Sequence, residues 1–189
     1  MNLLAEAEEL ELQYRAHRFE MESNRRCALE VIRLHAFNAS KPSRLISGIA
    51  VSSPRLNANG SAFEARGAQY EFPIPLLWHH DWSRPLGEVK SVTVRGDTLF
   101  FTAQIGNNLT WTDQIWAAII SKQAYGVSIG AMRIDRSLHQ PVSSRWDLLE
   151  ISIAQSHADG GAVITSCSER APVVYSDGRS SVTLHWEDR

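Results

Sequence analysis

The residues with the clearest chemical potential lie in the segment IPLLWHHDWSRPLG, which covers residues 74–87. An apolar, strand-like approach ends there in His79, His80 and Asp81, between two tryptophans. Histidine titrates near neutral pH, so it can serve as a general base, a metal ligand or a plain core residue. Which of these roles applies depends on the partners that the rest of the chain supplies.

A metal site at the two histidines is not expected. Adjacent residues of a strand point to opposite faces, so His79 and His80 cannot readily share one ion. The remaining histidines show no spacing typical of metal ligands: His17, His35, His139, His157 and His185. The sequence therefore predicts neither a metal nor another cofactor.

A serine in the segment GVSIG, residues 126–130, matches the G-x-S-x-G pattern of the nucleophile elbow. That elbow needs a strand before the serine and a helix after it, whereas here a helix is expected first and a strand continues after Ser128. The α/β-hydrolase interpretation therefore fails. The glycines are expected to thin the strand so that a peptide backbone can approach Ser128. A buried serine on a strand is the alternative.

A carboxylate stands in the third segment, WDLLEISIA, residues 146–154. Strand alternation places Glu150 and Ser152 on one face and apolar residues on the other. Such a carboxylate either has a dedicated partner or lies on a solvated face, and the sequence leaves both readings open. A serine nucleophile needs a base, and the base needs an orienting acceptor, in any chain order. His80, Ser128 and Glu150 are the candidate set.

The elements that would position these residues are mostly short strands between residues 31 and 168. Turn residues separate the strands, and the segment EVKSVTV-RGD-TLFFTAQI is the clearest hairpin. The expected strands are VIRLHAF, RLISGIAV, the two hairpin arms, residues 127–135 and residues 146–154, with one helix at 112–123. This pattern predicts an α+β fold in which strands dominate.

Residues 1–30 form a separate, charged segment without glycine or proline. Apolar and aromatic positions recur there at alternating spacings of four and three, which is typical of an amphipathic helix: Leu3, Ala7, Leu10, Tyr14, His17 and Met21. The helix either packs on its own domain or serves as an arm that binds a partner. At the other end, residues 169–189 are expected to form a polar tail, with one last strand at 181–186.

The composition excludes several classes of protein. The chain has 189 residues, 43% of them hydrophobic, and six tryptophans, which suffices for one domain with a real core. The net charge of −2 gives no basic field for nucleic acid, and no apolar run approaches the length of a membrane span. Cys27 and Cys167 lack C-x-x-C spacing, which favours a reduced, intracellular protein.

Three segments resemble, in order and spacing, the prohead (capsid maturation) proteases of tailed phages: LLWHHDWSRPLGEV, YGVSIGAMRI and WDLLEISIA. A fourth segment, SRLISGIAV at residues 43–51, resembles the glycine-containing strand that opens the domain in that family. The resemblance covers about residues 43–165. Each segment is modest evidence alone, but their shared order makes the resemblance specific.

The prohead proteases are similar in turn to the herpesvirus assemblins, serine proteases built on a small β-barrel. The resemblance implies a small, mainly antiparallel barrel with surrounding helices. Carried over to this sequence, the histidine directly before Asp81 is His80, and the family serine is Ser128. The third catalytic position matches Glu150. Assemblins use a second histidine there, which keeps His157 as an alternative.

The resemblance also implies a function. The chain would be a serine endopeptidase that cleaves scaffold or the major capsid protein's scaffolding segment, and then itself. It would act as a homo-oligomer inside the procapsid, in the host cytoplasm, with no nucleic-acid or membrane partner. Residues 31–168 would be the protease domain. A non-catalytic β-barrel assembly module and a small-molecule esterase are the alternatives.

Overall fold

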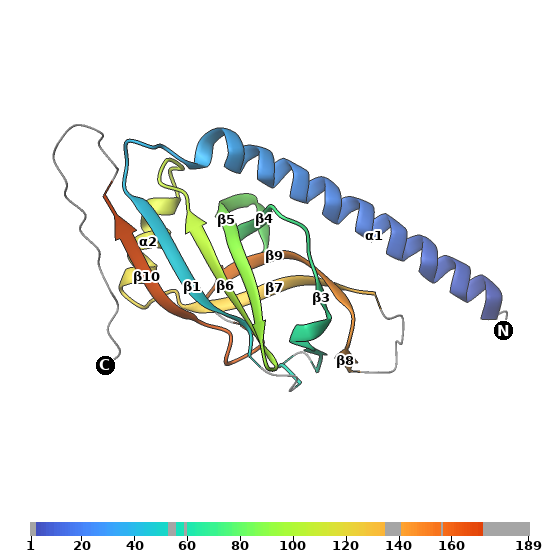
Figure 1. Ribbon diagram of the computed structural model, residues 1–189. Helices are drawn as coiled ribbons and strands as arrows, with labels where there is room; N and C mark the ends of the chain where they lie inside the picture. The colour runs from blue at the N-terminus through green and yellow to red at the C-terminus, as the bar shows by residue number, and fades with distance from the viewer. Residues whose placement is uncertain (1–2, 53–55, 59, 135–140, 156, 172–189) are drawn as a thin grey trace.

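The computed structural model describes residues 3–52, 56–58, 60–134, 141–155 and 157–171. Its helical elements, in chain order, are the long helix α1 (Leu3–Val31), the π-helical turn η1 (Ile32–Ala36), the 3₁₀ turn η2 (Ala65–Gly67) and helix α2 (Thr112–Ile120). Helix α1 runs across the sheet and its N-terminal end projects beyond it (Figure 1). Neither α1 nor α2 has the length and apolar character of a membrane-spanning helix, within the described residues.

The strands form one large sheet and one small one. They are β1 (Ser43–Val51), β2 (Ala62–Phe63), β3 (Ala68–Gln69), β4 (Ile74–Trp78), β5 (Asp81–Arg95), β6 (Thr98–Ile105), β7 (Gly126–Arg133), β8 (Val142–Ser143), β9 (Trp146–Ala154) and β10 (Ile164–Arg170). The eight-stranded sheet has the order β10-β1-β6-β5-β4-β9-β3, and β7 pairs with β9; β2 and β8 form the small sheet. β9 runs parallel to β4 and β3, and the other pairs of the large sheet are antiparallel.

The large sheet is not closed into a barrel, so that part of the predicted fold is wrong. Strand β7 meets the chain before β10 at the bridge between Gly126 and Val163 and at the hydrogen bond from the Val127 N–H to the Ala162 carbonyl, 2.9 Å. β10 then pairs with β1 instead of continuing along β7, and this leaves the sheet open. The predicted α+β class, with a large sheet and two helices, is confirmed.

The core lies against one face of the large sheet. Helix α2 covers this face with Ile115, Trp116 and Ile119, all buried. The strands contribute the rest, chiefly Ile46, Ile74, Leu76, Leu99, Phe101, Ile105, Val127, Trp146, Leu148, Ile151 and Ile153. Because β4, β7 and β9 all take part in this core, packing fixes the three strands that approach the candidate residues.

The segment VIRLHAF is helical and not the predicted strand. Its two buried residues, Ile32 and Ala36, are four positions apart and pack with Leu109 in a small second cluster. Four is a helical spacing, so the apolar run continues α1 as one wider turn. The expected strands at 44–51 and 146–154 and the β5–β6 hairpin are present, the strand expected at 127–135 ends at Arg133, and β5 begins at Asp81, well before its expected start at Glu88.

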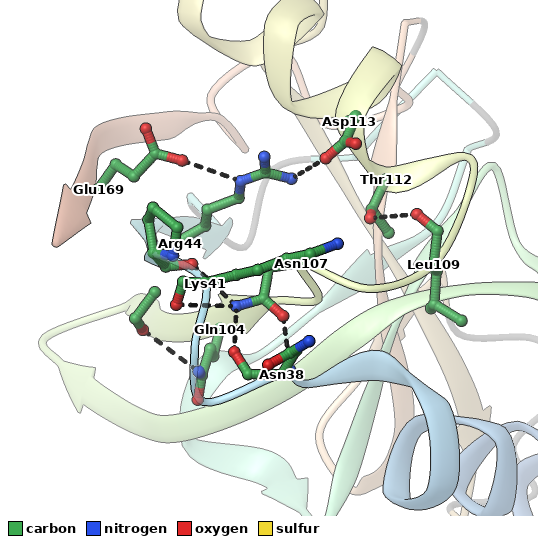
Figure 2. A network of polar contacts seen from close by, with 11 residues as sticks. Asn38, Lys41, Arg44, Gln104, Asn107, Leu109, Thr112, Asp113 and Glu169 are labelled. Carbon is green, nitrogen blue, oxygen red and sulfur yellow. Dashed lines mark hydrogen bonds and ion pairs between the residues drawn. The ribbon is translucent and has the colours of Figure 1, made fainter. Parts of the chain in front are cut away.

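A polar network joins the end of this helical segment to the sheet (Figure 2). The Asn107 side chain accepts from the Asn38 N–H at 2.7 Å and donates to the carbonyls of Asn38 and Pro42 at 3.0 and 2.9 Å. Beside it, the Arg44 guanidinium pairs with Asp113 of α2 at 2.6 Å and with Glu169 of β10 at 3.1 Å. Residues 38–44 are therefore tied to α2, to β10 and to the loop that carries Asn107.

Helix α1 is held less firmly towards its N-terminus. The Arg25 guanidinium donates to the carbonyls of Glu71 and Pro73 at 2.6 and 2.9 Å, and the Tyr14 hydroxyl donates to the Arg133 carbonyl at 3.2 Å. Leu12 and Phe19, on the other hand, are 69% exposed. That residues 1–30 are an extension separate from the protease domain stays a prediction. The strand expected at 181–186 lies outside the described residues, and β10 reaches Arg170, into the range expected to be tail.

Candidate active site

The three candidate residues lie on three neighbouring pieces of the sheet. Glu150 is on β9, which lies between β4 on one side and β7 on the other. Ser128 is on β7, where it pairs with Ser152 of β9. His80 follows the end of β4, whose residue Leu77 also pairs with Ser152. The serine and the histidine thus approach the carboxylate from opposite sides of one strand.

The two histidines form the turn between β4 and β5, and not the end of a strand as expected. Trp78 and Asp81 are paired across the hairpin, which leaves His79 and His80 as a two-residue loop. Both have positive φ angles, 52° and 61°, the pattern that a type I′ turn requires. The expectation that these residues alternate between strand faces is therefore wrong. Non-glycine residues in this region cost about 1–3 kcal/mol each and recur at functional sites.

Hydrogen bonds link the three side chains in series. His80 Nδ1 lies 2.5 Å from Glu150 Oε1, and His80 Nε2 lies 2.9 Å from Ser128 Oγ. The Glu150 side chain is 1% exposed, whereas that of His80 is 46% exposed. With Glu150 ionised, the imidazole donates from Nδ1 and accepts the serine proton at Nε2. This arrangement activates a serine hydroxyl as a nucleophile.

Glu150 raises the pKa of His80 above its ordinary value of 6.5. The hydrogen bond from the imidazole to the carboxylate is the largest cause, and the negative charge of Glu150 adds to it. Partial burial of the ring acts in the opposite direction. The site therefore favours the imidazolium, the form that His80 would take once it has removed the Ser128 proton.

Gly130 makes room for the buried carboxylate. It pairs with Glu150 across the β7–β9 ladder, and a Cβ at this position would lie 2.5 Å from Glu150 Oε1. The space left by the missing side chain is thus filled by the side chain of Glu150. The expectation that this glycine serves the approach of a substrate backbone is wrong, because the Glu150 side chain lies there.

The other two histidines of this region, His79 and His157, make contacts outside the hydrogen-bonded series. The His157 ring packs edge-on against Tyr125, with ring centroids 6.2 Å apart, and lies close to Gly126. The ring of His79 packs against Trp78 at 4.4 Å, and its Nε2 accepts the Gln155 N–H at 3.4 Å. The group that lies beside His80 Nδ1 is the Glu150 carboxylate.

A hollow of about 260 Å³ opens beside Ser128. It lies between β7, the end of β1 and strand β2, and its walls combine apolar and polar side chains, among them Val51, Phe63, Val127, Ile129, Asn57, Ser61 and Asp159. The Asp159 carboxylate is already engaged, because it accepts from the N–H and hydroxyl of Ser52 at 2.8 and 2.5 Å. No cluster of possible metal ligands occurs among the described residues.

One residue at this site was not singled out as functional from the sequence. Ser152 is fully buried, donates its hydroxyl to Glu150 Oε2 at 2.7 Å and accepts the His80 N–H at 3.0 Å. The available signal was its position two residues after Glu150, on the same strand face.

Comparison with known proteins identifies the class to which this fold and site belong. The family model of the caudovirus prohead serine protease matches residues 58–173, which include His80, Ser128 and Glu150. The chain belongs to this family of serine proteases. The expected resemblance is thereby confirmed.

Two particular proteins are similar to the chain. The capsid polyprotein of Pseudomonas phage PAJU2 is 30% identical over 158 residues, which is 77% of this chain and 23% of that protein. The chain thus spans about a quarter of its relative. The crystal structure of KSHV protease in complex with a hexapeptide phosphonate inhibitor is similar at a TM-score of 0.41 and 13% identity, over 68% of this chain and 65% of that one.

Proposed function

We propose that the chain is the endopeptidase of capsid maturation, with Ser128 as nucleophile, His80 as general base and then general acid, and Glu150 as the orienting carboxylate. The observation that carries this proposal is the hydrogen-bonded series from buried Glu150 through His80 to Ser128. In acylation, Ser128 Oγ bonds to the scissile carbonyl carbon and its proton passes to His80 Nε2. That proton then goes to the leaving amine. Water next attacks the acyl-enzyme, with His80 again as the base, and Ser128 recovers its proton.

The hollow beside Ser128 is the proposed binding place for a substrate side chain next to the scissile bond. Val127, Ser128 and Ile129 contribute to its wall, so a side chain seated there brings its own carbonyl close to Ser128 Oγ. The hollow, of about 260 Å³, has room for a single side chain, and its walls offer both apolar and polar contacts to it.

The proposed substrates are the major capsid protein, its scaffolding segment and the protease itself. The relative in phage PAJU2 supports this, because it is named a capsid polyprotein and the region similar to this chain makes up 23% of it. A polyprotein has to be cut into its parts, and a protease segment within it is suited to that reaction. The proposed place of action is the inside of the procapsid in the host cytoplasm, where copies of the chain are concentrated as oligomers.

A fluorophosphonate probe tests the catalytic proposal without knowledge of the substrate. The full-length chain is expected to gain one covalent adduct at Ser128 by intact-mass analysis, and Ser128→Ala is expected to gain none. Co-expression with the capsid protein of the same phage then tests the substrate. Ser128→Ala should leave that protein uncut, since loss of a triad nucleophile lowers the rate by about 10⁶.

The outcomes separate the alternatives. A folded wild-type chain that gains no adduct would be a non-catalytic assembly module. A labelled chain that hydrolyses small esters and leaves the capsid protein intact would be an esterase. Adduct formation together with capsid cleavage that needs Ser128 supports the endopeptidase.

A further inference from the structure

A single buried hydroxyl, that of Ser152, connects the Glu150 carboxylate to the backbone of His80. Ser152 Oγ lies 2.7 Å from Glu150 Oε2 and 3.0 Å from the backbone nitrogen of His80. The Ser152 side chain is 0% exposed, so water cannot replace either contact. A serine hydroxyl has one proton and accepts through its lone pairs, so it can donate to the carboxylate and accept from the N–H simultaneously.

Its position in the sheet explains why it reaches both groups. Ser152 pairs with Leu77 of β4 on one side and with Ser128 of β7 on the other. The turn that carries His80 begins just past Trp78, and the neighbouring His79 N–H donates to the Ile153 carbonyl at 3.1 Å. Strand β9 therefore holds both turn residues by their backbone nitrogens, one through its own backbone and one through the Ser152 side chain.

We propose that Ser152 is a positioning residue for proteolysis, which rests on the function proposed above. It fixes the Glu150 carboxylate and the His80 backbone relative to each other, so that the imidazole bridges Glu150 and Ser128 in one geometry. It touches neither substrate nor the reacting atoms.

Two features of the site make this fixation necessary. The backbone at His80 has a positive φ of 61°, which a histidine adopts only where its surroundings hold it there. The Glu150 carboxylate has two oxygens, and the imidazole occupies one of them. Without a donor on the other oxygen, the carboxylate can rotate, and a displacement of about 1 Å at a catalytic group lowers the rate by about 10².

Three variants of the full-length chain test the proposal. Ser152→Ala removes the hydroxyl, and Ser152→Thr retains it. Ser143→Ala is the matched control, because Ser143 is also 0% exposed and its hydroxyl donates to the Arg145 carbonyl at 3.2 Å. Each variant is reacted with the fluorophosphonate probe over a range of concentrations, which separates the maximal acylation rate from the probe's binding constant. Thermal unfolding confirms that each is folded.

The expected result is a fall of about 10- to 100-fold in the maximal acylation rate of Ser152→Ala, with the binding constant of the probe unchanged. Ser143→Ala should react like wild type, and Ser152→Thr should recover most of the rate. A folded Ser152→Ala that reacts at the wild-type rate overturns the proposed role of Ser152 but leaves the proposed function standing. If wild type itself is not labelled, the proposed function has failed. If Ser152→Thr does not fold, the comparison of Ser152→Ala with Ser143→Ala still decides.

Discussion

At the scale of single residues, the site is organised around a gradient of burial. Glu150 is 1% exposed, while the His80 side chain it contacts is 46% exposed and Ser128 borders an open hollow. Burial of a carboxylate costs free energy unless it is hydrogen-bonded, and both oxygens of Glu150 are. The buried end of the series thus provides a carboxylate held in a fixed position, and the exposed end borders the hollow proposed for the substrate.

The pH dependence of activity should reveal the charge of Glu150. His80 must be neutral to accept the Ser128 proton, and its pKa is raised above 6.5, so activity should rise with pH through a value above 6.5. Glu150→Gln removes the charge and the main cause of the shift, so the acidic limb of kcat/KM should move to lower pH. The rate should also fall by about 10²- to 10⁴-fold. A pH–rate profile of both proteins checks this, and an unmoved limb would contradict the role of Glu150.

The two turn histidines should differ sharply when replaced. Asparagine tolerates positive φ, so His79→Asn and His80→Asn keep the turn while removing the ring. His80→Asn should abolish labelling at Ser128, because no base remains. His79→Asn should be labelled at a rate within about threefold of wild type, because the variant loses only a ring that packs on Trp78 and lies near Gln155. Equal loss in both variants would mean that the turn as a whole, and not the His80 imidazole, is required.

At the scale of elements, strand β9 is the common support of the site. It carries Glu150 and Ser152, pairs with the strand of Ser128 and binds the turn of His80. Glu150 and Ser128, though not Ser152, could be selected as candidates from the sequence, because a carboxylate in an apolar strand and a serine between two glycines stand out. The turn could not be predicted in the same way. Its residues are two histidines in place of the usual Asn-Gly, so the hairpin lacked its local signal.

Gly130 should be intolerant of any side chain. An added Cβ would lie 2.5 Å from Glu150 Oε1, so Gly130→Ala must push the carboxylate away from His80 Nδ1. The acylation rate should therefore fall by about 10² or more. Gly96→Ala is a suitable comparison for general strain, because it lies in the β5–β6 turn with nothing within 4 Å of its added Cβ. Labelling kinetics of both variants test this, and a fully active Gly130→Ala would show that the carboxylate has room to move.

At the scale of the whole molecule, local patterns predicted the strands but not how the sheet ends. Alternation identified β7 and β9, whereas closure of a barrel depends on whether β7 pairs with β10, two strands far apart in the chain. The apolar run at 31–37 was ambiguous for a related reason. A short apolar run fits a strand or a buried helical turn, and the contact with Leu109 decides between them.

The structure also changes what is expected of the N-terminal segment. The sequence predicts that residues 1–30 are a separate segment, so removal of the chain up to about Ser40 would be expected to leave activity intact. Such a chain would lose buried Ile32 and Ala36 and the hydrogen bonds between Asn38 and Asn107. Burial of an isoleucine side chain alone contributes about 1.5–3 kcal/mol. The loss would also expose the Leu109 side of the core.

Two shortened chains separate the parts of this segment. One starts at Asn24, which keeps the Arg25 contacts to Glu71 and Pro73 and the buried cluster around Ile32. It should unfold within a few degrees of the full chain and be labelled at Ser128 at a similar rate, because the side chains described in the removed part, from residue 11 to residue 23, are largely exposed. The other starts at Ser40 and should unfold at a markedly lower temperature. Thermal unfolding and probe labelling of both measure this. If the chain starting at Ser40 is as stable as the full one, the helical segment up to Ala36 is an appendage and not part of the core.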